Sequence, residues 1–126
     1  MKNKHFLNLL FLLISSVVLG QTYTMSNGAN GTISTCSGTF VDSGGSGANY
    51  ANTQSSTITF CPSTPGDKIR VNFTSFNTES NGVTCNDYLE VWHANAVGAV
   101  GTQDERICGT PGAFTITSMS ADGCVS

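Results

Sequence analysis

Short segments in which apolar and polar residues alternate, separated by turn residues, constrain the fold of this chain more than any other feature. The clearest, residues 68–74 (KIRVNFT), would place its three apolar side chains on one face of a strand and its polar side chains on the other. Residues 57–61 (TITFC) and 87–92 (DYLEVW) keep the same period of two. No stretch beyond the first 20 residues repeats apolar residues at helical spacing. The sequence therefore predicts an all-β fold, an antiparallel two-sheet sandwich or jelly roll.

Turn residues mark both ends of this fold. The pairs Asn27-Gly28 and Asn30-Gly31 predict tight turns that join short strands around Tyr23 and Ile33 into a first hairpin. A late Asp122-Gly123 pair predicts another turn, after which a further strand is expected. The sequence stops short of that strand, so we expect a sandwich that lacks its last strand and leaves backbone donors and acceptors along an edge.

The first 20 residues have the character of an export signal. Lys2 and Lys4 precede a mostly apolar run over residues 6–19, and small residues follow it before Gln21. The run is shorter than the roughly 20 residues of a membrane helix, so we expect no membrane insertion after the signal is removed. The sequence predicts a signal peptide over residues 1–20 and one secreted domain over residues 21–126, located outside the cell or at its surface.

The charge of that domain limits its partners. It carries three basic residues against eight acidic ones, a formal net charge of −5. The basic residues are scattered, so the chain has no electrostatic footprint for a nucleic acid or an anionic membrane. An acidic surface is better suited to a divalent cation or a basic partner.

All five cysteines lie beyond the expected signal, at Cys36, Cys61, Cys85, Cys108 and Cys124. Export delivers a chain to an oxidising compartment, where cysteines of a small domain form disulfides by default. Disulfides would also compensate for the modest core that about 100 residues can bury.

A further set of residues follows a fixed order along the chain: Cys36 with Gly38 and Phe40, Tyr50 and Asn52, Cys61, residues 69–76, Glu79, Cys85, residues 87–91, Cys108-Gly109, Pro111 and Ile116. In this order, from Cys36 to Ser126, the chain resembles the CUB domain family. Its small, polar residues and its opening segment look like the CUB-like modules at the front of exported surface proteins in Bacteroidetes-type bacteria.

The resemblance implies two disulfides, Cys36 to Cys61 and Cys85 to Cys108, and leaves Cys124 unpaired. It also implies a calcium ion, because Glu79 and Asp87 match two of the carboxylates that bind calcium in many members of the family. The family's third carboxylate would lie beyond Ser126. Glu79 and Asp87 can meet only if the chain folds back between them, and the Asn81-Gly82 pair predicts a turn that permits this. Solvated loop acids are the alternative interpretation of Glu79 and Asp87.

Residues Tyr88, Glu90 and Trp92 share the outward face of one expected strand. Exposed aromatic residues are enriched at binding sites, so these three are candidates for contact with a partner, with burial of Trp92 under a loop as the alternative. His93 is the only histidine beyond the expected signal, and it has no acid in an ordered arrangement with a nucleophile. We therefore expect no enzyme activity.

These features predict a secreted, non-catalytic interaction or adhesion module that binds a protein or a glycan through calcium-ordered loops. The alternative is an N-terminal accessory domain of a larger exported enzyme, such as a protease, of which this chain is a fragment.

Overall fold

The structure is a computed structural model that describes residues 20–99 and 103–126. The expected signal peptide lies outside the described residues except for Gly20. The described residues contain eight strands and no helix, so the all-β prediction is confirmed. The strands are β1 (Thr22–Thr24), β2 (Gly28–Thr35), β3 (Thr39–Val41), β4 (Ser56–Pro62), β5 (Arg70–Phe73), β6 (Leu89–Trp92), β7 (Gln103–Ile107) and β8 (Phe114–Thr117).

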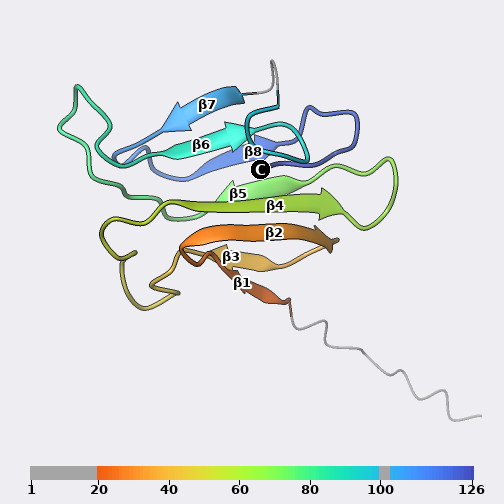
Figure 1. Cartoon of the computed structure of the whole chain (residues 1–126), viewed down its shortest axis with the longest axis horizontal. Helices are drawn as coiled ribbons and strands as arrows, with labels where there is room; N and C mark the ends of the chain where they lie inside the picture. The colour runs from red at the N-terminus through yellow and green to blue at the C-terminus, as the bar shows by residue number, and fades with distance from the viewer. Residues whose placement is uncertain (1–19, 100–102) are drawn as a thin grey trace, which may run out of the picture.

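The strands associate in four pairs (Figure 1). Pairs β5–β8 and β6–β7 are antiparallel, as expected. Pairs β1–β3 and β2–β4 are parallel, which corrects the expectation of an antiparallel fold throughout. The chain alternates between two neighbouring pairs here: β1 is followed by β2, β3 returns beside β1, and β4 returns beside β2.

The first hairpin expected from the Asn-Gly pairs does not form. β2 pairs with β4 instead of β1, and its register shifts between Ala29 and Thr32. Gly31 lies inside this shift with a φ of 73°, so the Asn30-Gly31 pair forms a bulge rather than a turn. The Asn30 side chain donates hydrogen bonds to the carbonyls of Gly28 and Thr57, which ties the bulge to β4.

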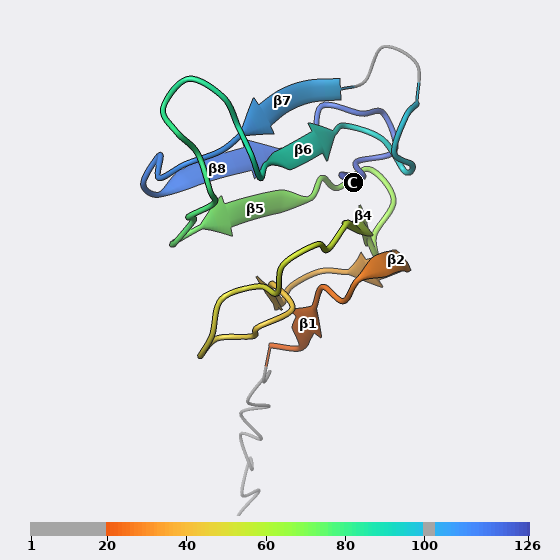
Figure 2. The same ribbon diagram turned by 60° about the vertical axis from the view of Figure 1, so that its left-hand side comes forward.

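The last residues of the chain lie between β4 and β6. Val125 exchanges two backbone hydrogen bonds with Phe60 of β4, of 2.8 and 2.9 Å. Ser126 exchanges two with Trp92 of β6, of 2.8 and 2.9 Å. Figure 2 shows the end of the chain between these two strands.

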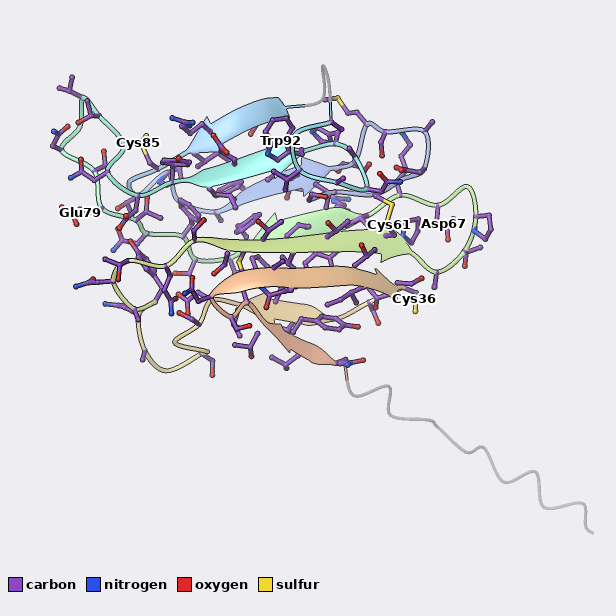
Figure 3. All side chains as sticks on the ribbon, viewed as in Figure 1. Cys36, Cys61, Asp67, Glu79, Cys85 and Trp92 are labelled. Carbon is purple, nitrogen blue, oxygen red and sulfur yellow. A yellow bond between two sulfur atoms is a disulfide. The ribbon has the colours of Figure 1, made fainter. Side chains whose placement is uncertain are left out.

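The disulfides differ in part from those implied by the resemblance (Figure 3). Cys61 bonds to Cys124, so the expected Cys36–Cys61 bond and the unpaired Cys124 are both wrong. The Phe60–Val125 bridge places Cys61 directly opposite Cys124, with their Cα atoms 4.2 Å apart, about the spacing of facing residues in an antiparallel pair that exchange no hydrogen bonds. Cys36, just past the end of β2, is exposed and unpaired.

Aromatic rings connect the strand pairs. Phe40 of β3 contacts Phe60 of β4 and Phe73 of β5, with ring centres 5.8 and 5.9 Å apart, and Phe73 stacks on Phe114 of β8 at 4.5 Å. The buried apolar residues that form the core are Ile58, Phe60, Val91, Ile116 and Val125. The apolar residues of the 68–74 segment are less exposed than its polar residues, as the alternation predicts. Among the described residues, no helix has the length and apolar character needed to cross a membrane.

Candidate functional site

The segment between Thr78 and Asp87 folds back on itself into a narrow loop. Ser80 and Cys85 form an antiparallel bridge at its base. At its tip, the side-chain oxygen of Asn81 accepts hydrogen bonds from the N–H groups of Val83 and Thr84, at 3.0 and 2.7 Å. Gly82 follows with a φ of 81°. Residues that have a side chain adopt this conformation only at a cost in free energy. The predicted Asn81-Gly82 turn is confirmed.

The base of this loop is tied to the end of β7. Cys85 bonds to Cys108, as the resemblance implied. Next to the disulfide, Thr78 and Gly109 exchange two hydrogen bonds: the Gly109 N–H donates to the Thr78 Oγ1 at 2.9 Å, and the Thr78 N–H donates to the Gly109 carbonyl at 3.1 Å. A covalent bond and two hydrogen bonds therefore fix where the loop begins.

The fold of the loop brings Glu79 and Asp87 to one place. The N–H of Asp87 donates to the carbonyl of Glu79 at 3.0 Å, and the Asn86 side chain donates to Oε1 of Glu79 at 3.0 Å. Both acids line one surface cavity of about 250 Å³, together with Asn49, Tyr50, Asn52, Asn77 and Thr78. We call this set of residues the acidic cavity.

Tyr50 completes the acidic cavity from the connection between β3 and β4. Its hydroxyl donates a hydrogen bond of 2.8 Å to Oδ2 of Asp87 and accepts one of 3.4 Å from the N–H of Glu79. Burial, followed by the hydrogen bond to Asp87, raises the pKa of Tyr50 above its ordinary value, so the phenol stays protonated at neutral pH. No local sequence pattern assigns a role to Tyr50, because 37 positions separate it from Asp87.

The acidic cavity offers oxygen atoms of several kinds. Glu79 and Asp87 supply carboxylates, and Asn49, Asn52 and Asn77 supply amide oxygens. Calcium takes six to eight oxygen ligands from carboxylates, amides, backbone carbonyls and water. The oxygen atoms that line the cavity are therefore of the types that bind calcium, and Glu79 and Asp87 contribute two negative charges. In the described part of the chain, no three acidic, histidine or cysteine residues lie close enough together to hold a metal ion. The third carboxylate expected beyond Ser126 stays a prediction.

The second candidate surface, Tyr88, Glu90 and Trp92, is partly covered by Arg106 of β7. The Arg106 guanidinium lies 4.0 Å from the centre of the Tyr88 ring and forms an ion pair with Glu90. The hydrogen bond that Arg106 donates to the Glu90 carboxylate raises the pKa of Arg106. Tyr88 stays 46% exposed, whereas Trp92 is half-buried, and its Nε1 has no hydrogen-bond partner among the described residues.

His93 is buried directly after β6. Its Nδ1 accepts a hydrogen bond of 3.0 Å from the N–H of Met119. This arrangement fits a histidine that holds two segments together.

The two disulfides indicate an oxidising compartment. No family model, no curated protein and no solved structure matches this chain.

Proposed function

We propose that this protein is a secreted, non-catalytic interaction module of the CUB-like kind, in which calcium bound at the acidic cavity orders the surrounding loops for contact with a protein or a glycan. The observation that carries this proposal is that Glu79 and Asp87 line one cavity, with the Tyr50 hydroxyl bonded to Asp87. Carboxylates on opposite sides of the molecule would have ruled out a shared cation.

The proposed architecture is a two-sheet sandwich. On one side, Val125 and Ser126 bond to β4 and β6 and so connect the pair β2–β4 to the pair β6–β7. On the other side lie β1, β3, β5 and β8 (Figure 2). The ring of Phe40 of β3 contacts the ring of Phe60 of β4, which joins the two groups, and also the ring of Phe73 of β5. Packing of inward-facing apolar residues between two layers is what such a sandwich requires.

The role we assign to the cation is structural. Three separate chain segments meet at the acidic cavity: the connection between β3 and β4, the start of the narrow loop, and the residue that leads into β6. A cation bound to carboxylates and amide oxygens from these segments would fix their relative positions. Fixed loops lose less conformational entropy when a partner binds, which increases affinity.

The polar lining suits a partner rich in hydrogen-bonding groups. Asn49, Asn52 and Asn77 present side chains that can both donate and accept at the cavity, and all three residues are exposed. Hydroxyl groups of a glycan and amide groups of a protein loop are both suitable partners for such side chains.

Calcium titration tests the proposal. Calcium should raise the unfolding temperature of the protein, purified with its disulfides intact, by several degrees over a chelator, because a ligand that binds only the folded state stabilises it. Glu79→Gln and Asp87→Asn should each abolish most of this shift. Asp67→Asn is the matched control, since Asp67 lies on an exposed turn at the opposite end of the molecule (Figure 3). Equal unfolding temperatures with calcium and with chelator would refute the calcium site.

A further inference from the structure

One edge of β2 has no partner strand in the described part of the chain. β2 pairs with β4, and no other described strand or isolated bridge involves it. The Ser63 N–H donates a hydrogen bond of 3.2 Å to the Thr35 carbonyl, so Thr35 directs its backbone groups toward β4. Successive residues of a strand direct these groups to opposite edges, so Ile33 also faces β4, whereas Thr32 and Ser34 face outward. We call the outward N–H and C=O groups of Thr32 and Ser34 the β2 edge.

The sequence around the β2 edge carries almost no charge. Residues 20–66, which contain β1 to β4, include a single charged residue, Asp42. The other seven acidic residues and the three basic residues of the domain all lie within residues 67–126. A second copy of this acidic domain can therefore approach along β2 with less repulsion than along the rest of the surface.

Other strands with an open edge have features that discourage pairing with another chain. β7 contains Asp104, Glu105 and Arg106, and charged residues on an edge strand are a common protection against such pairing. β1, β3, β5 and β8 each have one partner strand, and their three or four residues offer only a short edge. β2 has eight residues, and its segment beyond the bulge, from Thr32 to Thr35, keeps a regular register with β4. The longest open edge is thus the one without charge.

The β2 edge is complementary to itself. When two copies of β2 lie antiparallel about a two-fold axis at Ile33, Thr32 of each copy lies opposite Ser34 of the other. Facing residues whose backbone groups point toward each other exchange two hydrogen bonds in an antiparallel pair. All the outward groups of Thr32 and Ser34 then gain a partner. The Ile33 side chains, which pack against the core, meet at the axis and become further buried.

We propose that the β2 edge is a homodimer interface, in which two copies of this chain pair antiparallel and join their β2–β4 pairs into one sheet. Figure 2 shows β2 at the rim of the molecule, on the far side of β4 from β6 and β7. The interface is small, so the expected Kd is about 1 µM or weaker. The dimer does not depend on calcium at the acidic cavity.

A charge exchange between the two facing positions tests the proposal. The variant Thr32→Lys/Ser34→Lys places like charges opposite each other across the dimer, whereas Thr32→Glu/Ser34→Lys places opposite charges there. Both residues are exposed, so the substitutions leave the core unchanged. The first variant has the smaller net negative charge, so general repulsion between copies would favour its association rather than oppose it.

Sedimentation equilibrium from about 1 µM to about 1 mM measures the association of the original protein and both variants, with disulfides intact. We expect a dimer for the original protein and for Thr32→Glu/Ser34→Lys. Association of Thr32→Lys/Ser34→Lys should be weaker by about tenfold or more. A Cys36→Ser version should dimerise like the original, which separates strand pairing from a disulfide between the exposed Cys36 thiols.

Hydrogen exchange locates the contact. The N–H groups of Thr32 and Ser34 should exchange more slowly as the protein concentration rises, because only the second copy bonds them. Those of Ile33 and Thr35 should exchange slowly at every concentration, since they bond to β4. If a variant fails to unfold cooperatively, this concentration dependence in the original protein decides the question without it.

A monomer at the highest concentration would overturn the proposal and leave the β2 edge to a strand of a different protein. Equal association of the original protein and both charge variants would place the contact on another surface. Loss of the dimer in Cys36→Ser would show that a disulfide, and not strand pairing, joins the copies. Exchange at Thr32 and Ser34 that does not change with concentration would likewise refute the interface.

Discussion

Tyr50 donates a hydrogen bond of 2.8 Å from its hydroxyl to Oδ2 of Asp87, across 37 positions of the sequence. The bond joins the connection between β3 and β4 to the residue that leads into β6. It holds one of the two carboxylates of the acidic cavity in place, and the same hydroxyl accepts a hydrogen bond from the backbone of Glu79. The Tyr50 hydroxyl therefore forms hydrogen bonds with both acidic residues of the cavity.

Tyr50→Phe should lower the free energy of unfolding by about 1 kcal/mol, the usual net contribution of an intramolecular hydrogen bond to stability. Because the pKa of Tyr50 is raised above its ordinary value of 10.0, this contribution is present below about pH 10 and is lost as the pH rises through the folded-state pKa. Urea denaturation at neutral pH measures the difference. Tyr88→Phe is the control, since its ring keeps the contact with Arg106. Equal losses in both variants would contradict a special role for Tyr50.

Removal of the Cys61–Cys124 disulfide should cost far more stability than loss of Cys36. The bond closes a loop of 63 positions, for which the chain-entropy model gives about 4 kcal/mol. The double variant Cys61→Ser/Cys124→Ser should show this loss in urea denaturation without reductant, whereas Cys36→Ser should unfold like the original protein. Mass spectrometry of the unreduced protein after proteolysis identifies the pairing directly. A Cys36–Cys61 peptide would show that the disulfide assignment is wrong.

Gly82→Ala should destabilise the narrow loop by roughly 1 kcal/mol, because an alanine is strained at a φ of 81°. The same variant should also weaken the response to calcium, since the turn brings Glu79 and Asp87 together. Gly47→Ala is the matched control: Gly47 lies in an exposed connection with ordinary φ, and a methyl group there meets no other atom within 4 Å. Thermal unfolding with and without calcium measures both effects. An unchanged unfolding temperature in Gly82→Ala would contradict this account of the turn.

The stabilising effect of Asp122 should depend on pH. Its carboxylate accepts hydrogen bonds from the Ser120 hydroxyl and the Cys124 N–H, which lower its pKa, the hydroxyl having the larger effect. A lowered folded-state pKa means that the stabilisation is complete above the ordinary value of 3.8 and is lost as the pH falls through the folded-state value. The original protein should therefore be more stable than Asp122→Ala at neutral pH and lose part of that advantage near pH 2. Urea midpoints at both pH values check this, and a constant difference would argue against it.

Features that depend on neighbouring residues could be predicted from the sequence. The alternation in residues 68–74 identified the face of β5 that packs on the core, because strand geometry sends successive side chains to opposite faces. The Asn81-Gly82 pair identified the turn, because few other pairs tolerate its backbone conformation. The resemblance to a known family supplied the Cys85–Cys108 bond and the pairing of Glu79 with Asp87.

The tertiary structure alone decided which distant segments meet. The parallel pairing of β2 with β4, the bond between Cys61 and Cys124 and the place of Tyr50 beside Asp87 all join residues at least 27 positions apart. Local patterns specify which face of a strand is buried, but many strand orders bury the same faces. The choice among those orders depends on packing of the whole core, here the contacts of Phe40, Phe60 and Phe73, and no short stretch of sequence contains that information.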